Sequence, residues 1–206
     1  MRLTLHTFLT LDGVMQAPGG PEEDPSGGFA YGGWSVPYGD QESGAAITGY
    51  FEQASAFLLG RRTYQIFAGY WPKVTDPGNP VASKLNSLPK YVVSTMLGSL
   101  EWNNAQLLTG DVVTAVTKLK ERPGDELQVH GSGGLAQALI EADLVDEYRL
   151  MIIPVLLGSG MKLFRDGARP ATLRLINSSV TSTGVIIARY VPGGPVRTGS
   201  FDPDES

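Results

Sequence analysis

The chain has 206 residues and a formal net charge of −5, because 21 Asp and Glu outnumber 16 Lys and Arg. This balance excludes a broad basic surface that would track a nucleic-acid backbone. The absence of cysteine excludes disulfide scaffolds and thiolate metal sites, and no segment approaches the roughly 20 apolar residues of a membrane span. With 42% hydrophobic residues, we expect one well-filled cytoplasmic domain with neither nucleic-acid nor membrane partners.

The first half of the chain alternates strand and helix patterns. In chain order, these patterns predict a strand at 3–10, a helix from about 42, a strand at 56–60, helices at 63–71 and 80–88, and a strand at 90–95. Asp12 and Gly13 form a turn after the first strand, and Thr63 is the expected cap of the second helix. A long loop rich in Gly and Pro fills residues 16–40.

The second half continues the alternation and then changes to strands alone. The patterns predict a helix at 112–122 capped by Asp111, a strand at 127–130, a helix around 135–140, a strand at 148–157, and an antiparallel pair at 172–181 and 184–191. Alternating strands and helices favour a mostly parallel sheet covered on both faces. We place the end of the domain at residue 192 and a flexible tail at 193–206.

Residues 129–135, VHGSGGL, read as a strand, a Gly-rich turn and a helix start. Glycine lets the backbone approach a diphosphate closely, and a helix N-terminus presents N–H groups with partial positive charge. The turn therefore predicts a phosphate cradle, although it lacks the Rossmann spacing and the P-loop lysine. A plain tight connection is the alternative.

Residues 58–64, LLGRRTY, repeat this arrangement with Arg61 and Arg62 at the helix start. Two guanidinium groups suit the 2′-phosphate of NADP through bidentate contacts. Solvated surface arginines are the alternative interpretation. Two anion-binding turns in one domain would suit a dinucleotide.

Together with FLTLDGV at 8–14, YVVST at 91–95, LVDEYRLMIIPVLLGSG at 144–160 and GVIIARYV at 184–191, these segments resemble the dihydrofolate-reductase-like family. The resemblance is strongest to the C-terminal reductase domain of bifunctional riboflavin biosynthesis enzymes and covers about residues 1–192. It implies an α/β, dihydrofolate-reductase-like three-layer fold. Its central sheet would be mostly parallel with a C-terminal antiparallel strand pair, helices would cover both faces, and NADPH would be the cofactor.

The resemblance also implies roles for individual residues. The 2′-phosphate of the adenosine would be held by Gly60, Arg61, Arg62 and Thr63. The adenine would be bordered by Ser94 and Thr95, and the diphosphate would be held by Gly131, Ser132, Gly133, Gly134 and Leu135. The nicotinamide would lie beside Asp12, Gly13 and Val14.

One departure from the family pattern concerns the acceptor. Dihydrofolate reductases proper bind the pterin through a carboxylate on the helix before the GR-T motif, whereas the matching stretch here is Gly44, Ala45 and Ala46. Asp40 and Glu42 lie just before it and fit charges at a helix start. We therefore expect an acceptor other than dihydrofolate.

Other candidate residues have structural alternatives. Asp12 is the candidate catalytic residue, but Asp-Gly is also a common tight turn. His6 could donate a proton, although a core or sheet-face histidine is the favoured interpretation. The acidic group of Asp143, Asp146 and Glu147 resembles a metal cluster only in its charge, so we expect a solvated helix end and no metal site.

Aromatic residues interrupt the 16–40 loop and predict an ordered segment. We expect it to be a lid over the active site, with Phe29 or Trp34 contacting a flat acceptor. A loop that its aromatics merely pin to the surface is the alternative. The apolar excess of the C-terminal strands predicts a homodimer.

The leading hypothesis is an NADPH-dependent reductase that transfers a hydride to a small conjugated heterocycle, such as a pteridine or a flavin-pathway pyrimidine. The main alternative is a non-catalytic nucleotide-binding or regulatory module that retains the fold. A flavin-binding variant is a weaker third hypothesis.

Overall fold

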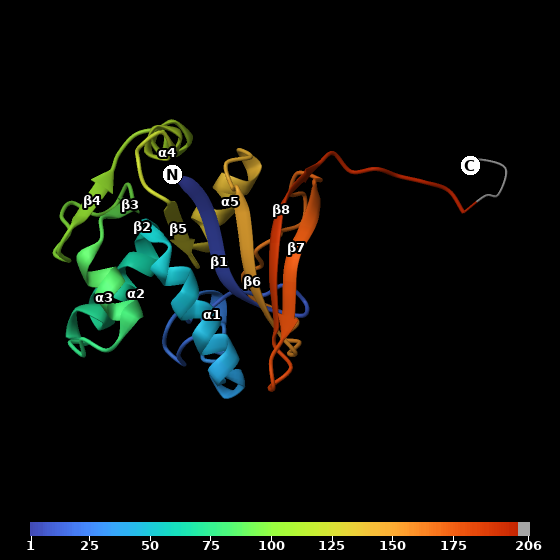
Figure 1. Ribbon diagram of the computed structural model, residues 1–206, viewed down its shortest axis with the longest axis horizontal. Coiled ribbons are helices and arrows are strands. Elements are labelled where there is room, and N and C mark those ends of the chain that lie inside the picture. Colours follow the sequence, from blue (N-terminus) through green and yellow to red (C-terminus); the bar gives the residue numbers. More distant parts are fainter. Residues whose placement is uncertain (202–206) are drawn as a thin grey trace.

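A computed structural model describes residues 1–201, which are built around one eight-stranded sheet (Figure 1). The strands are β1 (Arg2–Thr10), β2 (Ala54–Gly60), β3 (Lys90–Val93), β4 (Ala105–Leu108), β5 (Glu126–His130), β6 (Glu147–Ile153), β7 (Thr172–Val180) and β8 (Ile186–Gly194). Their order across the sheet is β4-β3-β2-β5-β1-β6-β8-β7. Strands β1 to β6 are parallel, and β8 and β7 complete the sheet as antiparallel neighbours.

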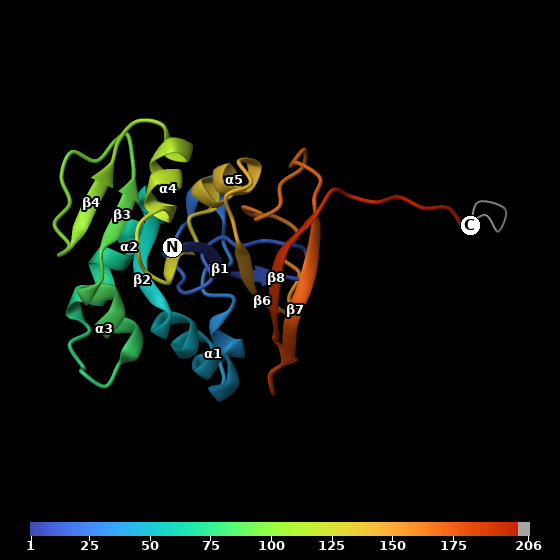
Figure 2. The same cartoon turned by 45° about the horizontal axis from the view of Figure 1, so that its top comes forward.

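Helices cover both faces of the sheet, as Figure 2 shows. The α-helices are α1 (Gln41–Glu52), α2 (Arg61–Tyr70), α3 (Pro80–Ser87), α4 (Val112–Lys120) and α5 (Gly133–Glu141). Three short 3-10 helices lie at Ser26–Gly28, Val36–Tyr38 and Trp71–Lys73. Helices α4 and α5 pack on one core, and α1, α2 and α3 pack on the other face. The expected dihydrofolate-reductase-like architecture, with a mostly parallel sheet and a C-terminal antiparallel pair, is confirmed.

Strand β1 shows how alternation assigns the two faces. Leu3 and Leu5 are fully buried in the core beneath α4 and α5. Thr4 and His6 point to the opposite face, where both are also buried. Because both faces of a central parallel strand are covered, its polar residues need partners inside the protein.

The structure corrects several element predictions. Strand β4 was not expected, because its four residues at the sheet edge show no clear alternation. Helix α2 begins at Arg61 with Gly60 as its N-cap, so the prediction that Thr63 caps it was wrong. Strand β6 ends at Ile153 instead of residue 157 because Pro154 has no N–H group to continue the pairing.

The C-terminal boundary also differs from the expectation. Strand β8 continues to Gly194, which pairs with Thr172, so the sheet extends past the expected domain end at residue 192. Residues 195–201 then run away from the domain (Figure 1). Positions 202–206 of the expected tail lie outside the described residues.

Across residues 1–201, no helix combines the length and the apolar character that a membrane span requires.

Strand β7 forms one edge of the sheet and leaves apolar side chains exposed, with 49% exposure for Leu175 and 70% for Val180. We expect these residues to pair two copies of the chain through their β7 edges. Light scattering at micromolar concentration should give the mass of a dimer, and Val180→Lys should shift it toward the monomer. A monomer in the unmodified protein would contradict this prediction.

Candidate functional site

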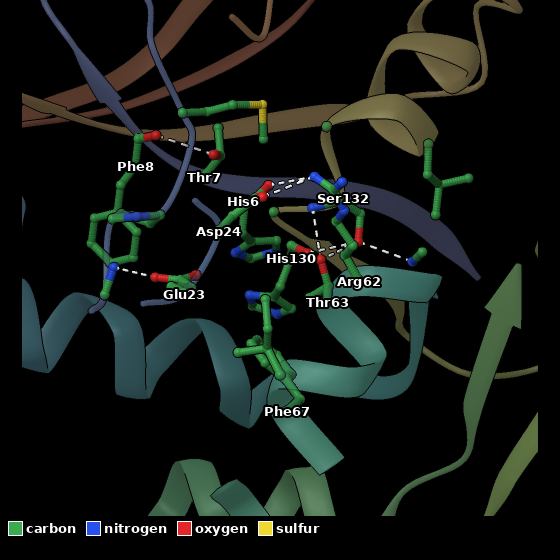
Figure 3. Close-up of a pocket in the computed structure, with 18 of the residues that line it drawn as sticks. His6, Thr7, Phe8, Glu23, Asp24, Arg62, Thr63, Phe67, His130 and Ser132 are labelled. Carbon is green, nitrogen blue, oxygen red and sulfur yellow. Dashed lines mark hydrogen bonds and ion pairs between the residues drawn. The ribbon is translucent and has the colours of Figure 1, made fainter. Parts of the chain in front are cut away.

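A cavity of about 910 Å³ opens where the central strands end and helices α2 and α5 begin (Figure 3). Its lining includes nine residues that the sequence assigned to a cofactor: Gly60, Arg61, Arg62, Thr63, Gly131, Ser132, Gly133, Gly134 and Leu135. The fold brings the two turns to one site, where Ser132 contacts Thr63 and Gly60 across 69 and 72 residues of the chain. The carboxyl ends of parallel strands are the usual ligand-binding edge of an open α/β sheet.

Hydrogen bonds join the two turns directly. The Thr63 Oγ1 atom accepts from the Ser132 backbone N–H at 3.1 Å and from the Ser132 hydroxyl at 2.9 Å. The Gly60 N–H donates to Ser132 Oγ at 3.0 Å. Neither helix has a side-chain cap at its N-terminus, so both helix starts face the cavity without one.

Gly133 packs so closely against Met161 that a larger residue there would force Met161 to move. A Cβ atom added there would lie 2.2 Å from the Met161 sulfur. Ser132 adopts the left-handed conformation with φ of 55°, which turns the chain sharply into α5. Beside Gly134 the space is open, because an added Cβ would meet no atom within 4 Å.

Arg62 ties the long loop to the start of α2. Its Nη1 atom donates to both oxygens of Asp24, at 2.8 and 2.9 Å, and to Ser26 Oγ at 2.6 Å. Burial alone would raise the pKa of Asp24, but hydrogen bonds from Ser26 and the charge of Arg62 outweigh it and lower the pKa. Arg61 is less committed, since its Nη1 atom donates to Gln65 Oε1 of the same helix at the long distance of 3.3 Å.

A run of rings lines the other part of the cavity. The imidazoles of His6 and His130 are stacked with centroids 4.6 Å apart, and Phe51 stacks on the far side of His130 at 4.6 Å. Tyr50 meets His6 edge-on at 5.4 Å. Phe67 of α2 also lines this part of the cavity. The expectation that His6 lies on a sheet face is confirmed.

Both imidazoles are neutral at pH 7. Burial lowers the pKa of His130 to about 3, with a further contribution from the Arg149 charge. Burial also lowers the pKa of His6 well below its ordinary value, and the neighbouring His130 and Arg149 act in the same direction.

Beneath α1, a buried charged network lies next to the histidines. Arg149 has no side-chain exposure and donates to Glu126 and Glu147, at 2.5 Å from Nη2 and 2.7 Å from Nε respectively. Arg189 also contacts Glu147 at 2.7 Å. Burial would raise the pKa of Glu147, but hydrogen bonds from Arg189 and Arg149 bring it to about 2.

This network overturns one expectation. Glu147 was expected in a solvated helix end, but its side chain has no exposure and lies in β6. Asp146 accepts from the Leu3 N–H at 2.7 Å and pairs with Lys120 at 2.8 Å. Glu147 therefore joins β6 to β8 through Arg189, and Asp146 joins the start of β1 to the end of α4.

Asp12, Gly13 and Val14, which were expected beside the nicotinamide, lie outside the cavity lining. The Asp12 carboxylate accepts from the Thr10 hydroxyl at 2.5 Å and from the Gly158 N–H at 2.7 Å. The Thr10 hydrogen bond is the main reason that the pKa of Asp12 is lowered, so the carboxylate is ionised at neutral pH. Gly13 has φ of 83° and completes the turn, and Val14 is fully buried. These contacts place Asp12 in a turn, which was the alternative to a catalytic role.

Four other predicted site residues also lie outside the lining. The Ser94 hydroxyl accepts from the N–H groups of Met96 and Leu97 in a turn, and Thr95 is its neighbour, whereas Val93 lines the cavity. Trp34 is 8% exposed, and its indole N–H donates to the Gln16 carbonyl at 2.7 Å. Phe29 packs beside Gly160. The part of the loop that lines the cavity comprises residues 16–19 and 23–24.

Sequence reasoning did not assign Tyr50, Phe51, His130 or Arg149 to the site. The available signal was polar residues two apart inside otherwise apolar strands, as in Glu126, Gln128 and His130 of β5. Such spacing puts them on one buried face.

The RibD C-terminal domain family matches residues 2–187 of this chain. The chain belongs to this family. The uncharacterized protein YyaP of Bacillus subtilis is 30% identical over 195 residues, covering 92% of this chain and 94% of its own. A second Bacillus subtilis protein, the uncharacterized YwjB, is 26% identical over 144 residues, with coverage of 68% and 78%.

Solved structures support the fold of the RibD C-terminal domain. A putative riboflavin biosynthesis protein from Shewanella sp. PV-4 superposes with a TM-score of 0.66 and 21% identity, covering 93% of this chain and 99% of that one. A diaminohydroxyphosphoribosylaminopyrimidine deaminase/5-amino-6-(5-phosphoribosylamino)uracil reductase from Thermotoga maritima gives a TM-score of 0.61 at 14% identity, covering 93% of this chain and 56% of its own. The RibD family and these neighbours confirm the resemblance found in the sequence.

Replacing Arg149 by Met should lower the free energy of unfolding by about 3–5 kcal/mol, because Glu126 is left buried with an uncompensated charge. Adding Glu126→Gln should recover part of this loss, since it removes the orphaned charge. Urea unfolding of both variants measures the difference. No recovery in the double variant would show that Arg149 acts through packing alone.

The two histidines should make stability fall on mild acidification. An unfolded histidine binds a proton below about pH 6.5, whereas His6 and His130 stay neutral in the folded protein to much lower pH. The stabilising effect is therefore complete only well above pH 6.5, and below that pH it falls by about 1.4 kcal/mol per pH unit for each histidine that stays neutral in the folded protein. Urea unfolding between about pH 7.5 and 5 should show about half the wild-type loss in His130→Phe. A pH dependence in His130→Phe equal to that of the wild type would contradict the conclusion that His130 is neutral in the folded protein.

Proposed function

We propose that this RibD-family chain is an NADPH-dependent reductase that transfers a hydride to a small conjugated heterocycle, either pteridine-like or similar to a flavin-pathway pyrimidine. The observation that carries the proposal is the meeting of two uncapped helix N-termini and two arginines at one cavity. A dinucleotide needs separated anion sites of this kind.

The residues present fit NADPH. Gly131 to Leu135 would hold the diphosphate, because the turn offers backbone donors and the space beside Gly134 is open. Arg61 and Arg62 would hold the 2′-phosphate through charge-assisted hydrogen bonds. The hydrogen bonds among Gly60, Thr63 and Ser132 fix the two sites relative to each other.

When bound, NADPH would supply the hydride, so the chain itself needs to orient the acceptor and exclude water. The apolar and aromatic walls around Tyr50, Phe51 and Phe67 serve both purposes. From α1, the residues that line the cavity are Ile47, Tyr50 and Phe51, none of which is a carboxylate. This lining supports an acceptor other than dihydrofolate.

A fluorescence titration tests cofactor binding, and NADPH oxidation with a panel of pterins and pyrimidines tests turnover. Binding of NADPH without oxidation by any acceptor would favour the alternative of a regulatory nucleotide-binding module.

Replacing Arg61 and Arg62 together by Ala should remove the preference for NADPH over NADH. Each lost charge-assisted hydrogen bond to the 2′-phosphate costs about 1.5–3 kcal/mol, whereas NADH has no such group. Arg169→Ala is a matched control, because the side chain of this arginine is 60% exposed and pairs with Asp143 outside the cavity. Equal affinity of the unmodified protein for both cofactors would contradict the assignment.

Asp24→Asn should tighten NADPH binding about two- to fivefold, because the carboxylate competes with the 2′-phosphate for Arg62. NADH binding should change less. Glu22→Gln is the control for the loss of one negative charge, since Glu22 is exposed two residues away. Weaker NADPH binding in Asp24→Asn would mean that the loop contact helps to hold the cofactor.

A further inference from the structure

The cavity has two chemically different parts. The part at the starts of α2 and α5 carries Arg61, Arg62 and the backbone donors of the Gly-rich turn. The part beneath α1 is walled by rings, which belong to His6, Tyr50, Phe51, Phe67, Trp71 and His130. Figure 3 shows His6, His130 and Phe67 following one another along this wall. If NADPH occupies the basic part, as the proposed function requires, the ring-walled part is left for the acceptor.

The arginine of the ring-walled part is already paired with buried carboxylates, so it is not free to bind an anionic ligand. Among the described residues that line the cavity, the arginines are Arg61, Arg62 and Arg149. The first two belong to the helix start. Arg149 has 0% side-chain exposure, and its hydrogen bonds go to Glu126, Glu147 and Gln53. It also lies over the Tyr50 ring, with the guanidinium carbon 4.6 Å from the centroid.

The histidines do not supply the missing charge. His6 Nε2 lies 2.9 Å from Thr4 Oγ1, and His130 Nε2 lies 3.1 Å from Gln128 Oε1. Both nitrogens thus have neutral partners within the sheet, and burial keeps the rings uncharged at pH 7. An anionic group brought into this part would lose its hydration without gaining a cation.

We propose that the acceptor is a neutral, flat aromatic heterocycle that carries no phosphate or carboxylate group. The walls offer faces and edges of rings for stacking, which a neutral conjugated molecule uses at no electrostatic cost. The Thermotoga maritima protein, by contrast, is described as acting on a phosphoribosylated pyrimidine. The substrate class of this chain thus differs from that of the Thermotoga maritima protein. The physical reason is that Arg149 is neutralised by its carboxylate partners and that the histidines are uncharged.

Binding of two fluorescent probes, pterin and 6-carboxypterin, tests this inference on the full chain saturated with NADP⁺. The probes share one ring system and differ by one carboxylate. We expect pterin to bind at least about tenfold more tightly, since tenfold corresponds to about 1.4 kcal/mol of unmatched desolvation. Equal or tighter binding of 6-carboxypterin would overturn the inference, and so would failure of both probes to bind.

Two variants at Phe67 test whether the ring-walled part is where the protein distinguishes pterin from 6-carboxypterin. Phe67→Lys adds a cation on a partly exposed wall residue, and Phe67→Leu removes the ring without adding charge. The lysine variant should bind 6-carboxypterin severalfold better than the leucine variant, with circular dichroism confirming that both are folded. Identical binding by the two variants would place the probe elsewhere and overturn the inference.

The outcome is separable from that of the proposed function. Selective pterin binding by a protein that does not bind NADPH would preserve the acceptor class and refute the reductase. Oxidation of NADPH by phosphorylated acceptors, with neutral ones inactive, would preserve the reductase and refute the acceptor class.

Discussion

The buried guanidinium of Arg149 is the constraint on which this side of the molecule depends. An isolated buried charge is costly, so its partners must be placed by the fold before the charge can be tolerated. Parallel pairing supplies them, because the register sets His6 beside Arg149 and beside His130. Glu126 reaches the guanidinium from β5, and Glu147 lies two residues before Arg149 on β6 itself. The strand order β5-β1-β6 is therefore stabilised by side-chain contacts as well as by backbone hydrogen bonds.

The same network borders the part of the cavity that we propose for the acceptor. Arg149 pairs with both carboxylates, and burial, with a smaller contribution from the Arg149 charge, keeps the stacked histidines neutral. Under the proposed function, such a wall would help to hold a conjugated acceptor against the cofactor. Stability and selectivity would then rest on one set of contacts, and a change at Arg149 would affect both.

Much of the fold could be predicted because its signals are local. Alternation identified β1, the antiparallel pair β7 and β8 was visible from two apolar runs, and Asp111 caps α4 with its side chain 2.8 Å from the Thr114 N–H. Strand β4 could not be predicted, since four residues at an edge carry little pattern. The cavity required more than local signals: the two turns could be named from the sequence, but only the sheet order brings Ser132 within hydrogen-bonding distance of Thr63.

The long loop shows why aromatic residues alone do not identify a lid. Trp34 is buried against Met151, Ile153 and Ile187, so removing it from this cluster would expose a large apolar surface. The contact of Asp24 with Arg62 is different, because Arg62 is 49% exposed and an ion pair at such a position contributes only about 0–1 kcal/mol. A phosphate arriving at Arg62 could therefore replace Asp24 at little cost while Trp34 stays in place. Any movement that accompanies cofactor binding should thus be confined to the segment around Asp24, with the aromatic part of the loop serving as its fixed support.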